Sequence, residues 1–146
     1  MEISILHLLI STLILTNEVT MNIPQNLKYT KDHEWIKIEG KVGTIGITDF
    51  AQGELGDIVY VDIAPDISEL LMGESFGTIE AVKTVSDLYA PVTGKVLELN
   101  KKLNDEPQIV NTDPYGEGWI IKIELSDASQ LNGLLDAAAY NSQLGH

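Results

Sequence analysis

Lys83 is the residue of this sequence whose setting most favours chemistry. It stands between two β-branched residues, Val82 and Thr84, and the stretches on either side, 76–79 and 85–89, are typical of short β-strands. The chain must reverse here, yet it lacks the Asn-Gly or Asp-Gly pair that makes a tight reversal easy. Departures from local rules are expected at functional sites. We therefore predict that Lys83 lies on an exposed hairpin turn, where a modifying enzyme can reach its amine.

Three roles for Lys83 are compatible with such a turn. The first is covalent attachment of a prosthetic arm, which a tether would hold at high effective concentration near several active sites in turn. The second is a Schiff-base or general-base lysine, but this needs burial or a neighbouring cation, and the nearby Glu80 and Asp87 are anionic instead. The third is a solvated charge on an interaction module. Spacing alone favours the third role, because most exposed lysines have no special function.

The composition narrows the class of protein. With 146 residues and 44% apolar content, the chain is long enough for one globular domain. Its net charge of -13, with nine lysines and no arginine, argues against binding to nucleic acid or to acidic membranes. An acidic surface steers a protein toward partners with basic docking patches, although solubility alone would explain it equally well.

The sequence contains no cysteine, which excludes disulfides, thiolate metal sites and cysteine nucleophiles. Its three histidines, His7, His33 and His146, lie far apart and show no metal-ligand spacing. We therefore predict no metal site. His33 stands beside Glu34 and the two could form a functional pair, but a lone, partly exposed histidine is the simpler interpretation.

Residues 1–20 differ from the rest of the chain. The apolar run 3–15 carries no charge, but it is shorter than the roughly 17 to 25 residues of a membrane-spanning helix. Glu2 replaces the positive start of a signal peptide, and the run lacks the arginines of a mitochondrial presequence. We predict a non-essential apolar extension ahead of an ordinary start at Met21, a folded domain over 21–146, and a cytoplasmic protein that binds no membrane. A role of the extension in membrane binding or secretion is the less favoured alternative.

Most of the remaining chain has the patterns of β-structure. Alternating apolar and polar residues, bounded by turn signals, predict five further strands, over 35–39, 41–47, 57–63, 94–99 and 119–125. Residues 47–53 predict a short helical turn capped by Thr48 or Asp49, whereas 100–107 and 113–118 are typical of loops. Many short strands with frequent turns indicate a small sandwich or barrel.

Two weaker patterns complete the prediction. Four apolar residues recur at helical spacing near the C-terminus, at Leu131, Leu134, Leu135 and Ala138. They predict one C-terminal helix, capped by Ser126 or Asp127, whose apolar stripe packs on the barrel or binds a partner. A faint internal repeat opens strands with Gly-Lys-Val at 40–42 and 94–96, and would open later ones at 57–59 and 108–110. The two spacings differ, so this repeat is weak evidence.

Six stretches, taken together and in order, point to a family. They are 27–35 (LKYTKDHEW), 44–52 (TIGITDFAQ), 55–57 (LGD), 77–87 (GTIEAVKTVSD), 90–94 (APVTG) and 111–119 (NTDPYGEGW). From about residue 23 to 144 the chain resembles the H proteins of the glycine cleavage system. Any one stretch is common, but the ordered set is highly specific. Residues 1–20 have no counterpart in the family pattern.

The resemblance implies a lipoyl/biotinyl-carrier fold, which is mostly β: a flattened β-barrel (barrel-sandwich hybrid) of two sheets related by a pseudo-two-fold, with short helices that include a C-terminal one. It implies that lipoate is amide-linked to Lys83. Related biotin carriers usually have methionine on both sides of the lysine, and Val82 and Thr84 here favour lipoate instead. In the family, Glu80 and Gly94 help the lipoate-attaching enzyme to recognise the hairpin. Otherwise Glu80 is a solvated strand charge and Gly94 a simple turn residue.

The resemblance also implies a mechanism for a carrier that is not itself an enzyme. A PLP-dependent glycine decarboxylase (P protein) would load an aminomethyl group onto the arm, and an aminomethyltransferase (T protein) would pass its methylene to tetrahydrofolate and release ammonia. Dihydrolipoamide dehydrogenase (L protein) would then reoxidise the arm. Between these steps the loaded arm would fold back into a cleft that involves Glu34 and Asp87, where a carboxylate can pair with the amine and shield it from hydrolysis. We expect the carrier to be a monomer.

Two details depart from the family pattern, and two other functions stay open. Ala81 stands where a serine is common, and 67–72 is more apolar than expected of that loop.

The first alternative function is a lipoyl-relay carrier of the same fold, which supplies lipoyl groups to 2-oxoacid dehydrogenases. The second is an unmodified interaction module that has lost its partners.

Overall fold

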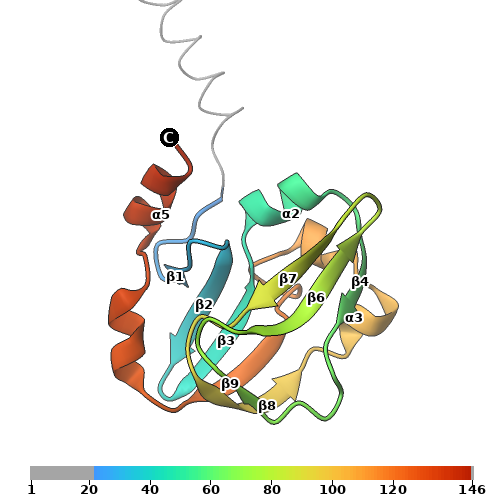
Figure 1. The fold of residues 1–146 in the computed structure, drawn as a ribbon. Coiled ribbons are helices and arrows are strands. Elements are labelled where there is room, and N and C mark those ends of the chain that lie inside the picture. The colour runs from blue at the N-terminus through green and yellow to red at the C-terminus, as the bar shows by residue number, and fades with distance from the viewer. Residues whose placement is uncertain (1–21, 146) are drawn as a thin grey trace, which may run out of the picture.

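The structure is a computed structural model, which describes residues 22–145. The predicted apolar extension 1–20, His7 and His146 lie outside the described residues, so the predicted division into an extension and one domain stays a prediction. Within the described part, the chain forms two antiparallel β-sheets and a few short helices (Figure 1). The mostly-β fold predicted from the sequence is confirmed. The two sheets stay separate and do not close into a continuous hydrogen-bonded barrel.

The larger sheet has six strands in the order β1-β2-β3-β9-β8-β5, and each neighbouring pair is antiparallel. Its strands are β1 (Lys28–Tyr29), β2 (Glu34–Glu39), β3 (Val42–Ile47), β5 (Glu69–Leu70), β8 (Gly94–Leu99) and β9 (Ile121–Leu125). Gly40, at a φ of 64°, makes the turn of the β2–β3 hairpin, a backbone conformation that glycine adopts without strain. The strands predicted over 35–39, 41–47, 94–99 and 119–125 are therefore confirmed.

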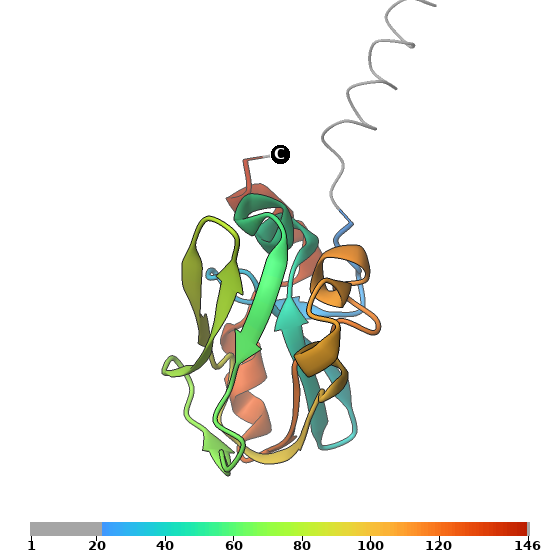
Figure 2. The same cartoon turned by 90° about the vertical axis from the view of Figure 1, so that its right-hand side faces the viewer.

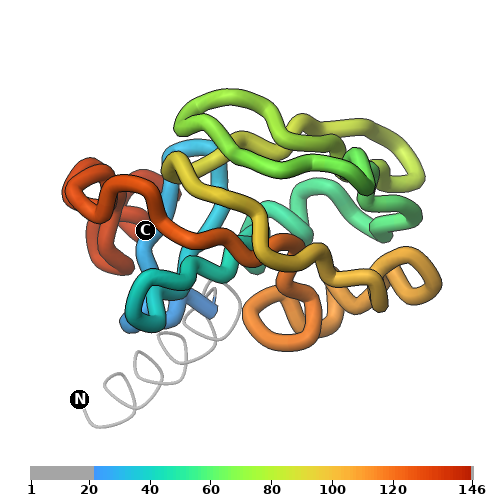
Figure 3. Tube along the Cα trace, turned by 90° about the horizontal axis from the view of Figure 1, so that it is seen from below, coloured from blue at the N-terminus to red at the C-terminus, as the bar shows by residue number. Residues whose placement is uncertain are grey.

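The smaller sheet has the order β4-β6-β7, with β4 (Ile58–Asp62), β6 (Ser75–Ala81) and β7 (Val85–Tyr89). β6 and β7 form one hairpin, and β4 pairs with the other edge of β6. The smaller sheet lies as a layer over the larger one (Figure 3), and its hairpin ends beside helix α2 (Asp49–Leu55) in Figures 1 and 2. Of the two caps predicted for this helical turn, Thr48 and Asp49, Thr48 caps α2, because its side chain accepts a hydrogen bond from the amide of Ala51 at 3.2 Å.

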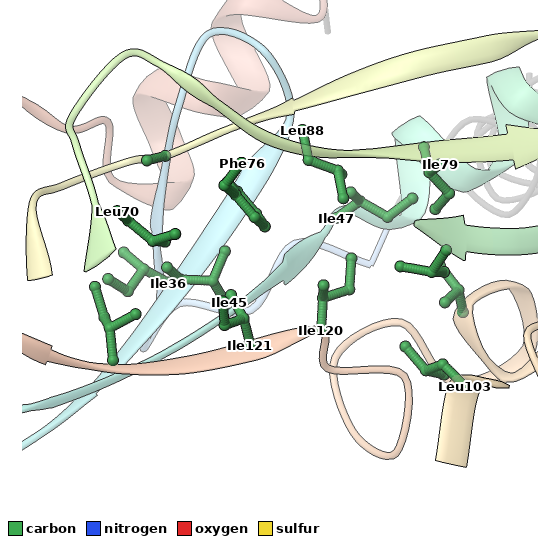
Figure 4. Close-up of a cluster of buried hydrophobic side chains, with 14 of the residues drawn as sticks. Ile36, Ile45, Ile47, Leu70, Phe76, Ile79, Leu88, Leu103, Ile120 and Ile121 are labelled. Atoms are coloured by element: carbon green, nitrogen blue, oxygen red, sulfur yellow. The ribbon is translucent and has the colours of Figure 1, made fainter. Parts of the chain in front are cut away.

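The main hydrophobic core lies between the two sheets (Figure 4). Ile36, Ile45 and Ile121 enter it from the larger sheet, and Ile79 and Leu88 enter it from the smaller one. All five are at most 1% exposed. Because side chains alternate along a strand, burying Leu88 turns its neighbours on β7 toward solvent.

The predicted C-terminal helical segment is confirmed, but it is divided into two helical pieces and is not one continuous helix. A 3₁₀ helix, η1 (Ala128–Gly133), is capped by Asp127, and α5 (Ala137–Gln143) is capped by Asp136. Between them Leu135 is extended, because it exchanges two backbone hydrogen bonds of 2.8 Å with Tyr29. Three of the predicted stripe residues, Leu131, Leu134 and Leu135, pack on the two cores, whereas Ala138 is exposed.

Two short helices replace predicted loop and strand. The loop predicted over 100–107 contains α3 (Lys102–Asp105), and the strand predicted to open at 108–110 is instead α4 (Ile109–Thr112). Each is a single turn anchored by one buried side chain, Leu103 or Val110. The second half of the faint repeat is therefore wrong at this point.

Candidate modification site and cleft

The turn that carries Lys83 is closed without glycine. The amide of Ala81 donates to the carbonyl of Thr84 at 2.8 Å, and the amide of Val82 donates to the carbonyl of Asp57 at 3.1 Å. The second bond ties the turn to the segment that leads into β4. Val82, Lys83 and Thr84 are all exposed. The predicted exposed hairpin turn is confirmed, because Lys83 lies between the end of β6 and the start of β7. Figures 1 and 2 show this hairpin.

The amine of Lys83 takes part in no ion pair within residues 22–145. The two pairs found there are Lys37 with Glu39 and Lys102 with Glu117. Val82 and Lys83 border a shallow depression whose other wall is formed by residues 53–57. An exposed amine on a turn is accessible from several directions, which suits acylation by a second protein.

Glu80 and Gly94 lie in different places relative to Lys83. Glu80 is half-buried on β6 and pairs across the sheet with Tyr60 on β4 and Val85 on β7, next to the turn. Gly94 is the first residue of β8. β8 follows β7 in the chain, on the side of β7 that is far from the turn. A Cβ atom at Gly94 would lie 2.6 Å from the carbonyl oxygen of Glu124, so the close approach of β8 to β9 requires glycine.

A cleft of about 380 Å³ lies where the far end of the hairpin meets the larger sheet and the C-terminal segment. Its wall consists of residues 29–32, Glu34, 72–73, 89–91, Gln130, 133–135 and Gln143. The C-terminal segment thus closes one side of the cleft, a contribution that the sequence did not indicate.

Glu34 places a buried carboxyl group in this cleft, only 2% exposed. One carboxylate oxygen accepts from the hydroxyl of Thr30 at 2.6 Å, and the other accepts from the amide of Tyr89 at 3.2 Å. Burial raises the pKa of Glu34 from 4.5 to about 7, because desolvation outweighs the hydrogen bonds that favour the charged form. Near neutral pH this carboxyl group is therefore poised between its neutral and charged forms.

Asp87 does not belong to the wall of the cleft. It is exposed on β7, pairs with Thr78, and accepts a hydrogen bond from the hydroxyl of Ser75 at 3.2 Å. Its side chain lies on the same face of β7 as Val85 and Tyr89, because Leu88 points into the core. Asp87 therefore lies between the Lys83 turn and the cleft, whereas Glu34 lies in the cleft itself.

No side-chain hydrogen bond or ion pair joins His33 to Glu34 in the described residues. His33 has a positive φ of 72°, and its Nδ1 atom lies 2.7 Å from the hydroxyl of Tyr140. That hydroxyl also lies 2.8 Å from the Thr48 hydroxyl, and the Tyr140 ring stacks on Tyr29 at 4.7 Å. Burial lowers the pKa of His33. These contacts could not be predicted from the sequence, since Tyr140 is 107 positions from His33.

The part of the chain that the structure describes contains neither a metal-binding cluster nor a membrane-spanning helix. No group of three or more His, Cys, Asp or Glu side chains there could hold a metal ion. No helix among residues 22–145 is both long enough and apolar enough to cross a membrane.

The titration of Glu34 predicts how stability depends on pH. Well below pH 4.5 the group is neutral in both the folded and the unfolded chain, so its ionisation does not change the free energy of unfolding. As the pH rises from 4.5 to about 7, only the unfolded chain loses its proton, so the free energy of unfolding falls by up to roughly 3 kcal/mol. Glu34→Gln removes this loss. Urea unfolding of both proteins between pH 4 and 8 measures the difference, and parallel curves would contradict the shifted pKa.

The packing at Gly94 predicts a loss of stability on substitution. Gly94→Ala forces β8 away from β9 and lowers the free energy of unfolding by roughly 1–3 kcal/mol. Gly53→Ala is the matched control, because a Cβ atom there meets nothing within 4 Å and alanine favours the helix. Urea unfolding checks both variants. A Gly94→Ala protein as stable as the parent would show that packing does not require this glycine.

Comparisons with known proteins agree with the fold. The family model described as "Glycine cleavage H-protein" matches residues 27–146. A glycine cleavage system H protein of Bacteroides thetaiotaomicron is 58% identical over 123 residues, which cover 84% of this chain and 97% of that protein. The H protein of Symbiobacterium thermophilum is 56% identical over 121 residues, 83% of this chain and 94% of its own.

A solved structure leads to the same family. The crystal structure of a glycine cleavage system H protein from Mycobacterium marinum superposes with a TM-score of 0.77 at 39% identity, and the match covers 85% of this chain and all of that one. A family model and close relatives thus match nearly the whole described chain. This chain belongs to the glycine cleavage H-protein family.

Proposed function

We propose that this chain carries lipoate in amide linkage on Lys83 and acts as the aminomethyl carrier of the glycine cleavage system. The observation that carries the proposal is the exposed turn at Lys83, inside a stretch that matches the family pattern. The chain itself catalyses nothing. Its partners are the lipoate-attaching enzyme, glycine decarboxylase, the aminomethyltransferase and dihydrolipoamide dehydrogenase, which it visits as a monomer in the cytoplasm.

The surface between Lys83 and the cleft suits a long arm. The outward side chains of β7 are Val85, Asp87 and Tyr89, and at about 3.3 Å per residue they span roughly 13 Å. An arm that starts at the turn and lies along this face reaches the cleft beside Tyr89. The cleft offers apolar wall from Leu134 and Leu135 and one buried carboxyl group from Glu34.

The residues of the cleft suit a cationic amine. When attached, lipoate supplies a dithiolane that accepts the aminomethyl group derived from glycine and later carries electrons as a dithiol. Glu34 would then hold the amine by a charge-assisted hydrogen bond, and a cation nearby would favour its charged form and release its proton. Asp87, on the path to the cleft, adds negative charge along the same face. A lipoyl-relay carrier has no need of such a carboxyl group, so Glu34 favours the aminomethyl carrier.

Glu80 and Gly94 would assist the attachment of lipoate to Lys83. Glu80 lies next to the turn and is placed to contact the enzyme that acylates Lys83. Gly94 would act on recognition indirectly, because it fixes how β8 packs at the base of the hairpin.

Mass spectrometry of the intact protein tests the attachment site. Protein produced in cells supplied with lipoate should gain one lipoyl group, and Lys83→Arg should gain none. Lys95→Arg, an exposed lysine on β8, is the matched control and should be modified like the parent. A parent without any adduct, or a Lys83→Arg variant that still carries one, would refute the assignment.

The lifetime of the loaded carrier tests the cleft. Glu34→Ala removes the charge-assisted hydrogen bond, and the loaded carrier should lose its cargo to water about tenfold faster, as expected for a loss of roughly 1.4 kcal/mol. Lipoylation itself should be unchanged. Glu39→Ala, at the exposed end of the same strand, is the control. Release of ammonia from loaded carrier measures the rate, and equal lifetimes in parent and Glu34→Ala protein would rule out the cleft role.

A further inference from the structure

The turn between β5 and β6 exposes two apolar side chains in succession. Leu70, the last residue of β5, is 1% exposed and enters the main core (Figure 4), whereas Leu71 is 47% exposed and Met72 is 52% exposed. These two residues end the stretch 67–72, which is more apolar than expected of that loop. Turn formation favours glycine and polar residues, so the local structure does not explain the exposed pair.

Backbone hydrogen bonds fix the position of Met72. The amide of Glu74 donates to the carbonyl of Leu71 at 3.0 Å, and Gly73 has a φ of 84°, so Met72 and Gly73 are the central residues of a tight turn. The amide of Gly73 donates to the carbonyl of Ala90 at 2.8 Å. The turn is therefore tied to the segment that follows β7, and its position does not depend on the packing of its own side chains.

Thr93 connects this turn to the C-terminal segment, which closes one side of the cleft. Its hydroxyl accepts a hydrogen bond from the amide of Met72 at 3.1 Å, and its amide donates to the side-chain oxygen of Gln130 at 2.8 Å. Gln130 lies in η1 and lines the cleft. One residue thus holds both the turn and the C-terminal segment at the cleft.

Met72 lies at the mouth of the cleft. It belongs to the wall together with Glu34 and Ala90, but those two residues are only 2% and 3% exposed. A residue that lines a cleft while half of its surface meets solvent lies where the cleft opens. Leu71 is exposed to a similar degree, but it is not part of the wall. The turn therefore carries two comparable apolar side chains, and only that of Met72 borders the cleft.

A methionine side chain suits the mouth of a cleft. It is unbranched and flexible, and its polarisable thioether packs on irregular apolar surfaces. Serine and glycine, which are more usual in turns, offer little apolar surface. Met72 can therefore contact an aliphatic chain that lies in the cleft, and it can leave the opening free when the cleft is empty.

We propose that the Met72 side chain folds over the arm when the arm lies in the cleft, so that it covers the mouth and slows the entry of water. The inference rests on the proposed function of Lys83, because the arm is the one attached there. Loss of the cargo consumes one water molecule. The carbon–sulfur and carbon–nitrogen bonds of the aminomethyl group break, the arm regains a thiol, and formaldehyde and ammonium leave. Because water is a reactant, a cover over the mouth slows this step.

Methyl NMR tests the contact between Met72 and the arm. Met72 is the one methionine among the described residues, since Met1 and Met21 lie outside them. The methionine methyl signal that is lost in Met72→Leu therefore belongs to Met72. This signal should shift between the unlipoylated and the loaded carrier, and it should stay in place in Lys83→Arg, which has no arm. A Met72 signal that does not move on loading would overturn the proposal.

The lifetime of the loaded carrier tests the cover itself. Met72→Ser should release ammonia about three- to tenfold faster than the parent, because its short polar side chain leaves the arm uncovered. Met72→Leu keeps the apolar bulk and should keep the parental lifetime. Leu71→Ser is the matched control, because it removes a similarly exposed apolar side chain from the same turn but outside the cleft. All three should be lipoylated like the parent, and thermal unfolding establishes that each is folded.

Oxidation of Met72 tests the cover in the parent chain. Hydrogen peroxide transfers one oxygen atom to the thioether sulfur, which is oxidised to the sulfoxide while the peroxide is reduced to water. The sulfoxide is polar and would cover an apolar arm poorly. Parent chain that is treated with peroxide before lipoylation and loading should lose its cargo as fast as Met72→Ser, whereas treated Met72→Leu should not. A treated parent with an unchanged lifetime would contradict the cover.

Failure of the cover differs from failure of the proposed function. A folded Met72→Ser protein with the parental lifetime would overturn the cover, and so would a Leu71→Ser protein that loses its cargo as fast as Met72→Ser. In both cases the lipoyl group on the parent would still support the role of Lys83. A parent that accepts no lipoate would instead refute the proposed function and the cover with it.

Discussion

The hydrogen bond from the Tyr89 amide to the Glu34 carboxyl group joins the two sheets at the cleft. Glu34 begins β2 of the larger sheet, and Tyr89 ends β7, an edge strand of the smaller one. An edge strand presents unpaired amides, and here one of them is satisfied by a buried side chain from the opposite sheet. The same bond therefore fixes the position of the hairpin base and orients the only strongly buried carboxyl group among the described residues.

The burial of Glu34 lowers the stability of the fold, but it places in the cleft a group that can change its charge. An apolar side chain at position 34 would avoid the desolvation that raises the pKa of Glu34 to about 7. Contacts from neighbouring residues hold the Glu34 carboxyl group in place despite this desolvation. The Thr30 turn supplies one hydrogen bond, and Tyr140 holds the neighbouring His33 in a left-handed conformation that costs ~1 kcal/mol in a residue other than glycine. The C-terminal helix thus supports the cleft through contacts far apart in the sequence.

The parts of the fold that follow local patterns could be predicted from the sequence. Local sequence patterns identified the β2–β3 hairpin and the two strands around Lys83, and the cap predicted at Thr48 or Asp49 identified the start of α2. What could not be predicted depends on tertiary contacts. The backbone bond between Tyr29 and Leu135 divides the C-terminal helix, and the burial of Val110 turns an apparent strand into helix α4. The buried state of Glu34 likewise depends on Tyr89, which lies 55 positions away.

The Lys83 turn and the cleft are separate sites joined by one strand, and this separation is a consequence of the alternation along β7. Because Leu88 must enter the core, Val85, Asp87 and Tyr89 are all directed outward and form a continuous surface between the two sites. A shift of one residue in the pairing with β6 would turn that surface inward and expose the core face. The register of a single hairpin therefore determines both where an arm is attached and where it can be sheltered.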